Sequence, residues 1–374
     1  MGTTPSGYLR LLGGKYNMLK VSFKKMKEQM VEEAKQTKTP ICATFELTPR
    51  CNLDCKMCYV HNQLSGSQQP MELSTKEWKR VFDEAYDCGL MFAIITGGEC
   101  LMRRDFQELY LHLWKKRVFI TILTNGILMN EDHIALLKKY KPEKVQISLY
   151  GSNENGYKNV TGHTGFEKAV NTIRRLTAAG IPVEVAITPS AYMKDDYIAT
   201  IKFCVENGFK FKQGDFILLE KRDGNPINGQ LTTDEMVSLA MDRAMLLNRL
   251  NPPVVELPMY GGTSHEAPRG LVCNAGKTAL VVSWDGSMRL CTGLPISNAS
   301  VIDMSYAEAW EQTKEAAQGI LLGMECVGCP YDSVCPKCPA IRLSGFDTGH
   351  CNPQVCELTR KLVACGVKRL PGYN

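Results

Sequence analysis

The sequence predicts an α/β protein built on a parallel β-sheet. Short apolar, strand-like segments alternate with helix-like segments six times in succession between residues 41 and 250. Parallel strands need a helical crossover between them, so this alternation is typical of a parallel sheet covered by helices. A barrel and an open doubly wound sheet both satisfy the pattern, and both bind ligands at the carboxyl ends of their strands.

Each element has its own local signal. Ser74 to Glu77 forms a capping box that begins a helix, and Gly89 and Gly180 follow helical segments where C-terminal caps are expected. The predicted strands cover residues 41–47, 91–96, 118–123, 144–150, 183–187 and 211–219. The predicted helices cover residues 16–35, 74–89, 106–116, 131–140, 166–179, 196–207 and 233–250.

Composition excludes several classes of protein. The 374 residues, 44% of them hydrophobic, suffice for a large core and two domains. No apolar stretch approaches the roughly 18 residues of a membrane span, and no secretion signal opens the chain, so we expect a cytoplasmic protein. The net charge of +5 comes from residues 1–40, which contain eight basic and three acidic side chains. We interpret this stretch as a basic extension whose helix covers the bottom of the sheet domain, or alternatively docks an acidic partner; nucleic-acid binding is not predicted.

A compact cysteine loop follows the first strand. Cys51, Cys55 and Cys58 have a C-x3-C-x2-C spacing, with Tyr59 directly after them. Sixteen cysteines without a secretion signal favour metal ligation over disulfides. A 4Fe-4S cluster normally takes four thiolates, so three leave one iron open to a small molecule. Zinc is the alternative, because His61 is near enough in sequence to complete a set of three cysteines and one histidine.

The spacing of this loop, the preceding Leu-Thr-Pro-Arg and the aromatic residue after the third cysteine resemble the cluster loop of the radical S-adenosylmethionine (radical SAM) superfamily. The resemblance implies a partial (β/α)6 TIM-like barrel. It also implies that Cys51, Cys55 and Cys58 hold a 4Fe-4S cluster whose open iron chelates SAM. An electron from the cluster then splits SAM into methionine and a 5′-deoxyadenosyl radical. The cofactors carry this chemistry, and the protein positions them.

The resemblance also assigns SAM-binding residues to the carboxyl ends of the strands. The triplet after the second strand is similar to the family's GGE motif, whose backbone and acid receive the amino group of SAM. Ser148 is expected to contact the ribose and methionine part of SAM, although Tyr150 stands where relatives often have an acid. The predicted cofactor-binding set is Tyr59, Gly97, Gly98, Glu99, Asn125, Ser148 and Thr188.

A second group of cysteines follows Asn251-Pro252-Pro253. Its two C-x2-C pairs are typical of a zinc ribbon, and residues 281–286 predict a hairpin with an Asp-Gly turn. The whole layout resembles the SPASM extension of radical SAM enzymes, which holds two auxiliary 4Fe-4S clusters. The resemblance assigns the first cluster to Cys273, Cys291 and Cys338, with Cys351 as an alternative fourth ligand. It assigns the second cluster to Cys326, Cys329, Cys335 and Cys356.

The resulting division is a basic extension (1–40), a radical SAM domain (41–250) and a SPASM domain (251–374). The resemblance implies an oxidoreductase that abstracts hydrogen from a side chain of a ribosomal peptide or small protein and forms a thioether, a carbon–carbon cross-link or a related modification. A flavodoxin or ferredoxin would donate the electron. The enzymatic alternative is an epimerase, decarboxylase or dehydrogenase of a small cofactor precursor. The alternative without catalysis is a zinc or ferredoxin-like binding protein.

Overall fold

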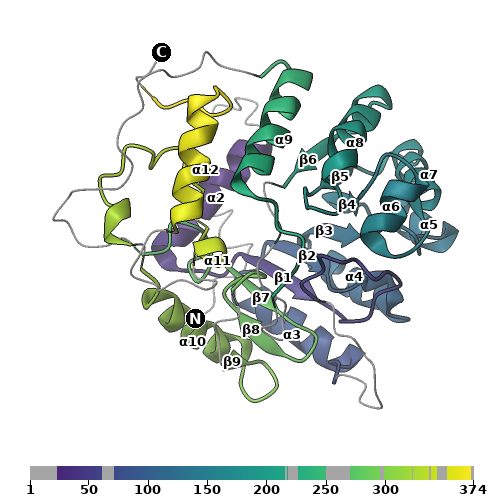
Figure 1. Cartoon of the computed structure of the whole chain (residues 1–374). Helices are drawn as coiled ribbons and strands as arrows, with labels where there is room; N and C mark the ends of the chain where they lie inside the picture. Colours follow the sequence, from purple (N-terminus) through teal and green to yellow (C-terminus); the bar gives the residue numbers. More distant parts are fainter. Residues whose placement is uncertain are drawn as a thin grey trace, which may run out of the picture.

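A nine-stranded sheet forms the centre of the protein (Figure 1). The computed structural model describes residues 23–60, 71–214, 217, 226–249, 270–294, 299–321, 323–336, 338–342 and 352–371. The strand order is β6-β5-β4-β3-β2-β1-β7-β8-β9. Six neighbouring parallel strands follow the order of the sequence: β1 (Cys42–Glu46), β2 (Phe92–Thr96), β3 (Phe119–Thr124), β4 (Lys144–Ser148), β5 (Val183–Ile187) and β6 (Phe211–Gln213).

Helices connect these strands, which confirms the predicted β/α repeats. The connecting helices are α3 (Thr75–Asp87), α4 (Phe106–Lys115), α5 (Glu131–Lys139), α6 (Glu154–Thr161), α7 (Phe166–Ala178) and α8 (Lys194–Glu206), and α9 (Thr233–Leu246) follows β6. The short 3-10 helix η1 (Cys100–Met102) lies between β2 and α4. The predicted capping box of α3 is present, since Ser74 and Glu77 each bond the other's backbone. Helix α6 was not predicted. Strand β6 ends at Gln213, whereas the predicted strand extended to residue 219.

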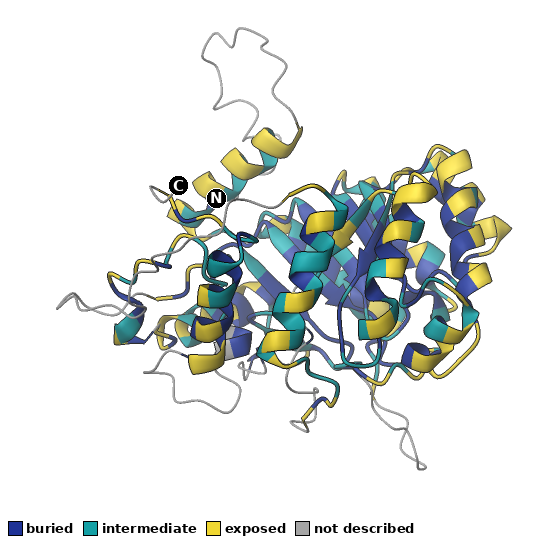
Figure 2. Cartoon of the chain, turned by 45° about the horizontal axis from the view of Figure 1, so that its top comes forward, coloured by how far each residue is buried: buried dark blue, intermediate teal, exposed yellow. Residues whose placement is uncertain are grey.

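The core lies between the sheet and its helices. Figure 2 shows buried residues concentrated on the strands and exposed residues on the outer faces of the helices. Phe45 of β1 packs edge-on against Trp78 and Phe82 of α3, and all three side chains are fully buried. Burial of large aromatic side chains of this kind contributes much of the stability of a domain.

Helix α2 (Phe23–Thr37) lies at the amino ends of the strands. Phe23 contacts the ring of Phe119 at the start of β3, with ring centroids 4.9 Å apart. Ala34 joins Ile41 and Phe92 in a small buried cluster. The expected helix beneath the sheet domain is therefore confirmed from residue 23, while residues 16–22 lie outside the described part of the chain.

The C-terminal region extends the same sheet. The hairpin of β7 (Ala279–Val282) and β8 (Ser287–Arg289) has the predicted Asp-Gly turn, and β7 pairs in parallel with β1. Strand β9 (Ala299–Ser300) completes the edge, followed by α10 (Tyr306–Gln318), the 3-10 helix η2 (Met324–Cys326), α11 (Pro339–Arg342) and α12 (Pro353–Ala364). Helix α12 lies beside α9 (Figure 1), and its leucines pack on Ala240. The region thus contacts both the first strand and the last helix of the repeats.

Across the described residues, every helix is too short or too polar to cross a membrane.

Candidate functional site

The cysteine loop and the Gly-Gly-Glu triplet lie side by side, because the parallel pairing of β1 and β2 continues beyond the strands. Leu47 donates to the carbonyl of Thr96 at 2.9 Å. Further along, Gly98 donates to Thr48 and Glu99 donates to Arg50, both at 2.8 Å. The backbone that leads into Cys51 is therefore fixed by three hydrogen bonds to the end of β2 and the triplet.

The two glycines are required by this pairing. A Cβ atom on Gly97 would lie 2.4 Å from the carbonyl oxygen of Thr48, and one on Gly98 would lie 2.5 Å from that of Arg50. Gly97 also has a φ of +136°, which L side chains rarely adopt. The two glycines therefore allow the backbone that leads into the cysteine loop to approach them closely.

Glu99 joins the end of β2 to the end of β3. Its carboxylate is 1% exposed and accepts hydrogen bonds from the Thr124 hydroxyl and the Asn125 backbone, both at 2.8 Å. The Leu101 backbone donates a third, at 3.1 Å. Burial raises the pKa of Glu99, and these donors oppose the shift. The predicted contact of Glu99 with the ammonium group of SAM stays a prediction, beside this observed role in joining the strands.

Asn125 reaches the first cysteine of the loop. Its side-chain amide lies 3.9 Å from the sulfur of Cys51 and donates to Asn52 at 2.9 Å. Its own oxygen accepts from the backbone of Ile127 at 3.0 Å, which fixes the orientation of the amide. A donor next to a thiolate stabilises the charge on sulfur. The observed partner of Asn125 is the cysteine loop, and its predicted contact with SAM stays a prediction.

Helix α6 holds the other side of the loop. The backbone amides of Asp54 and Lys56 donate to the carbonyls of Thr161 and Val160, at 2.9 and 3.0 Å. Both carbonyls belong to the last turn of α6, where acceptors lack intrahelical partners. The Lys56 ammonium group also donates to the side chain of Asn159 at 3.0 Å. Sequence reasoning missed this helix, although Asn153 caps its first turn and Gly162 ends it in the left-handed conformation.

The three thiols of the loop share one electrostatic environment. Burial, the nearby Glu99 carboxylate and Cys58 together raise the pKa of Cys51 to about 11. Burial likewise raises the pKa of Cys55 well above its usual value, with Cys58 and Cys51 as the next largest causes. A bound cation would reverse these shifts, because thiolates coordinate metals. The site therefore favours neutral thiols until a positively charged centre binds.

Three thiols on one loop are ligands of the kind that an iron–sulfur cluster takes. The thiolates of a 4Fe-4S cluster bind separate irons and therefore stand further apart than zinc ligands. His61, the fourth ligand of the zinc alternative, lies outside the described residues.

Tyr59 connects the loop to a buried carboxylate that sequence reasoning missed. The Tyr59 hydroxyl donates to Glu46, the last residue of β1, at 3.3 Å. Glu46 is fully buried and also accepts from Ser283 at 2.7 Å. A glutamate that ends an otherwise apolar strand, directly before the cysteine loop, was the available signal.

The other two predicted SAM contacts lie at the ends of β4 and β5. Burial raises the pKa of Tyr150, and the nearby side chain of Ser148 opposes this shift. Thr188 packs near Gly214, where an added Cβ atom would come within 3.1 Å of its side chain. Their assignment to SAM therefore stays a prediction that rests on their place at the carboxyl edge.

The cysteines assigned to the first auxiliary cluster come together. Cys273, Cys291 and Cys338 pack against one small apolar cluster that includes Leu271 and Leu290. Burial, together with the nearby Cys338 and Cys273, raises the pKa of Cys291 to about 11. These cysteines are separated by up to 65 positions in the sequence, from 273 to 338. Their proximity therefore supports the assignment from sequence order.

The second set is arranged around α12. Cys356 lies on α12 and is buried, as is Cys326. Cys329 packs beside Val363 of the same helix, and the backbone of Cys329 donates to Cys326 at 3.4 Å. Cys335 completes the set in the following turn. Cys351 lies outside the described residues, so its role stays a prediction.

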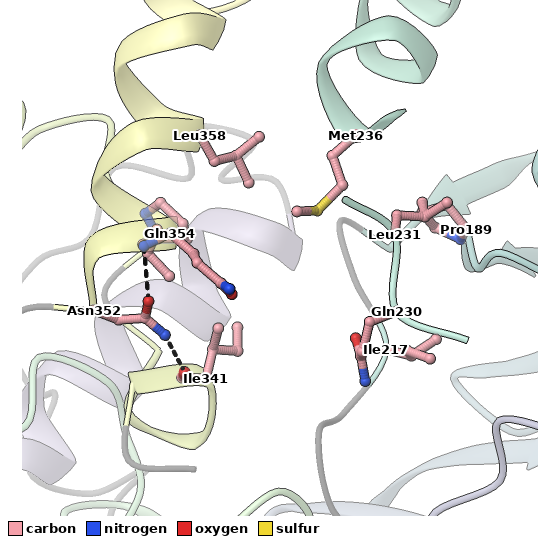
Figure 3. A pocket seen from close by; sticks show the side chains of 11 residues that line it. Pro189, Ile217, Gln230, Leu231, Met236, Ile341, Asn352, Gln354 and Leu358 are labelled. Atoms are coloured by element: carbon pink, nitrogen blue, oxygen red, sulfur yellow. Dashed lines mark hydrogen bonds between the residues drawn. The ribbon is translucent and has the colours of Figure 1, made fainter. Parts of the chain in front are cut away.

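A cavity of about 90 Å³ lies between α9 and α12, next to Pro189 at the end of β5 and Pro336 beside Cys335. Figure 3 shows Leu358 and Gln354 of α12 facing Met236 of α9 across this cavity. Its lining is mostly apolar, with the Gln354 amide at one side. Such a site accepts a single apolar group and offers a polar group to orient it.

Comparison with known proteins agrees with this geometry. A protein-family model described as the Radical SAM superfamily matches residues 45–204. The chain is 32% identical over 177 residues to the sporulation killing factor maturation protein SkfB of Bacillus subtilis strain 168. This match covers 47% of this chain and 42% of SkfB. The chain is 26% identical over 314 residues to the antilisterial bacteriocin subtilosin biosynthesis protein AlbA of the same strain, 80% of this chain and 67% of that protein. Less than half of SkfB is therefore matched.

Among solved structures, the fold is similar to that of Streptococcus suis SuiB bound to S-adenosylmethionine, with a TM-score of 0.64 and 16% identity. The likeness covers 91% of this chain and 84% of SuiB. At this identity it concerns the fold alone, and it supports the predicted partial barrel with its C-terminal extension.

Proposed function

We propose that this chain, which carries a radical SAM domain over residues 45–204, is an oxidoreductase that modifies a ribosomal peptide. The observation that carries the proposal is the gathering of Cys51, Cys55 and Cys58 at the carboxyl edge of the sheet, between the Gly-Gly-Glu triplet and α6. When bound there, a 4Fe-4S cluster and SAM supply a 5′-deoxyadenosyl radical that abstracts hydrogen from an unactivated carbon.

The residues of the chain hold and orient these cofactors. Cys51, Cys55 and Cys58 would hold the 4Fe-4S cluster that binds SAM. Asn125 donates toward the Cys51 sulfur, and the last turn of α6 fixes the backbone of the loop. Glu99 keeps the end of β3 against β2 and offers a carboxylate near the expected ammonium group. Precise placement of the reacting groups is what such a scaffold contributes to rate.

A peptide substrate is supported by the roles of the relatives. SkfB is a maturation protein for a sporulation killing factor, and AlbA serves the biosynthesis of subtilosin, a bacteriocin. By analogy, this chain forms a thioether, a carbon–carbon cross-link or a related modification on a side chain. We place an apolar side chain of the peptide in the cavity between α9 and α12.

We also propose that the C-terminal cysteines hold two auxiliary 4Fe-4S clusters. Cys273, Cys291 and Cys338, with Cys351 as the alternative fourth ligand, form the first set. Cys326, Cys329, Cys335 and Cys356 form the second. Bound clusters would supply an electron acceptor, and a ferredoxin or flavodoxin would donate the electron that cleaves SAM.

Two experiments test the proposal. Anaerobically purified protein should contain iron and sulfide, and it should produce 5′-deoxyadenosine from SAM under dithionite. Zinc without iron would support the binding-protein alternative instead. Anaerobic co-expression with short peptides encoded beside the gene should then give a product that lacks a pair of hydrogens by intact-mass analysis. An unchanged mass with altered retention would indicate epimerisation, and release of carbon dioxide would indicate decarboxylation.

A further inference from the structure

A second cavity lies inside the curved sheet, nearer the amino ends of the strands than the candidate site. Its volume is about 270 Å³, and its lining includes Lys212 of β6 and Ala279 of β7. Five strands separate β6 from β7 in the sheet, so the sheet must curve for both strands to reach one cavity. The described residues that line it include no predicted SAM contact and no cysteine assigned to a cluster. A space of this size holds several water molecules or one small ligand.

The register of the strands places polar side chains on the face of the sheet that lines this cavity. Thr44 of β1 and Thr121 of β3 both pair with Ile94 of β2, and Thr121 also pairs with Lys144 of β4. Paired residues of parallel strands share one face of the sheet, and Gln146 shares it with Lys144 because side chains alternate along a strand. All five residues line the cavity. The interior of the sheet is therefore polar along β1, β3 and β4.

Gln146 is a buried polar residue whose side chain has no partner in the described part of the chain. It is 9% exposed, and its amide group makes no hydrogen bond to a described residue. Thr121, which lines the same cavity, does have a partner, because its hydroxyl donates to Glu143 at 3.3 Å. Buried side-chain amides usually have hydrogen-bond partners. The amide of Gln146 therefore indicates a ligand or water in the cavity that it lines.

The charged groups around the cavity leave one ammonium group unbalanced. Lys27, Lys144 and Lys212 line it. The ammonium group of Lys27 lies 3.6 Å from the carboxylate of Glu143, and that of Lys144 lies 2.6 Å from Glu184. Lys212 forms no ion pair with a described carboxylate. Two carboxylates thus balance two of the three ammonium groups, and the remaining positive charge favours an anion.

The wall formed by β2, β7 and the end of β3 is apolar. Ile94, Leu123 and Ala279 line the cavity on this side. A ligand in the cavity would therefore meet polar groups on β4 and β6 and apolar groups on the other strands. Lys212 is exposed on the edge strand β6, which gives a ligand an approach from solvent. This combination suits an organic acid better than an inorganic ion, because an organic acid has an apolar part to bury.

We propose that this cavity binds a small organic carboxylate. The carboxylate group of the ligand binds the ammonium group of Lys212 and accepts a hydrogen bond from the amide of Gln146. Its short hydrocarbon chain packs on Ile94 and Leu123. Binding satisfies the buried amide and balances the positive charge, and hydrogen bonds to a charged group are the stronger kind. The inference goes beyond the proposed function and does not require a cluster in the cysteine loop.

The test is calorimetric titration of the full-length protein, purified anaerobically, with sodium butyrate at constant ionic strength. We expect saturable binding of one butyrate per chain. Lys212→Met removes the charge and Gln146→Met removes the amide, and both keep a side chain of similar length. Each should weaken binding about tenfold. Glu184→Gln releases Lys144 from its ion pair and should tighten binding, because it adds a positive charge to the cavity.

Lys210→Met is the matched control. Lys210 lies two residues before Lys212, but it lines a different cavity with residues of α7 and β5. Its affinity for butyrate should equal that of the unmodified protein. Because Lys212 is exposed, its substitution should leave the fold intact, and the unfolding midpoint without butyrate checks this.

Absence of saturable binding would overturn the inference. Equal affinities in Lys212→Met and Lys210→Met would overturn it as well, because butyrate would then bind elsewhere. Inorganic phosphate is the second probe, and it should bind more weakly than butyrate because it has no apolar part. Phosphate that binds as tightly as butyrate would refute the assignment to an organic acid. Each of these outcomes leaves the proposed function unchanged, since that function is tested by iron content and SAM cleavage.

Discussion

The hydroxyl of Ser283 donates a 2.7 Å hydrogen bond to the carboxylate of Glu46, and both side chains are buried. Glu46 ends β1 directly before the cysteine loop. Ser283 follows β7, in the hairpin between Cys273 and Cys291. The hydroxyl of Tyr59 also donates to Glu46, at 3.3 Å. One buried carboxylate thus joins the predicted SAM cluster site to the region of the auxiliary cysteines.

Ser283→Ala should weaken the contact between the β7–β8 hairpin and the end of β1. Removing a donor from a buried carboxylate costs about 1–3 kcal/mol, so we expect a lower midpoint of unfolding and less iron per chain. Ser287→Ala is the control on the same hairpin, because its hydroxyl donates within the turn to Asp285 at 2.7 Å. Denaturant unfolding and iron analysis measure both effects. Equal loss in the two variants would mean that the bond to Glu46 has no special role.

Local patterns predicted the repeats and most of the candidate site. Alternating apolar segments, the capping box at Ser74 and the Asp285-Gly286 turn are signals within a few residues of each other, and the structure contains all three elements. The cysteine order gave the grouping of Cys273 with Cys291, which the structure supports. These features depend on local sequence or on motif order alone.

The missed features depend on contacts between distant segments. The bond from Ser283 to Glu46 joins residues 237 positions apart. The same is true of the pairing of β7 with β1 and of the hydrogen bonds between α6 and the cysteine loop. Neither contact leaves a periodic signal in the local sequence. The physical basis of the glycine at position 97 was also unexpected, because the backbone that approaches Gly97 closely belongs to Thr48.

Combined substitution of Cys51, Cys55 and Cys58 by alanine should abolish reductive cleavage of SAM. No other residue of the chain is assigned to the iron that binds SAM, so 5′-deoxyadenosine should fall to background under dithionite. Iron bound by the C-terminal cysteines should remain. Cys88→Ala, a half-buried thiol at the end of α3, is the control and should retain activity. Continued formation of 5′-deoxyadenosine by the triple variant would disprove the assignment of the cluster loop.

Glu99→Ala should weaken SAM binding while iron content is kept. The change removes the predicted acceptor for the ammonium group and frees Thr124 and the backbone of Asn125 from their bond to the carboxylate. Loss of a hydrogen bond to a charged group costs about 1.5–3 kcal/mol, which corresponds to a tenfold or greater loss of affinity. Equilibrium binding of SAM to anaerobic protein measures it.

Glu184→Ala is the matched control for Glu99. Glu184 is a partly buried glutamate of β5 that pairs with Lys144 at 2.6 Å, near the amino end of the strand. Its loss should leave SAM affinity unchanged. If Glu99→Ala binds SAM as tightly as this control, the carboxylate serves only to join the strands.

Met236→Trp should interfere with the peptide and spare SAM cleavage. Met236 lines the cavity of about 90 Å³ between α9 and α12, and a larger side chain would fill it. We expect weaker peptide binding and slower product formation, with 5′-deoxyadenosine production in the absence of peptide unchanged. Met245→Trp on the same helix is the control, since Met245 is 51% exposed. Unaltered peptide affinity in Met236→Trp would place the substrate elsewhere.

The two C-terminal cysteine sets should respond differently to loss of a ligand. Cys326, Cys329, Cys335 and Cys356 connect turns with little regular structure to α12, so metal binding there is coupled to folding. Cys329→Ala should therefore mainly reduce soluble yield. Cys291 lies in the other set, on a segment that continues from the hairpin beside β1. Cys291→Ala should stay soluble and cleave SAM, but it should no longer complete the modified peptide.

Iron per chain, 5′-deoxyadenosine yield and product mass separate these two outcomes. Cys291→Ala should lose the iron of one cluster and the product but keep the 5′-deoxyadenosine yield, because SAM cleavage needs only the loop after β1. Its hairpin remains joined to that loop through Glu46 and Ser283, so general unfolding does not account for a lost product. Full product formation by Cys291→Ala would remove the first auxiliary set from catalysis and leave it a structural role.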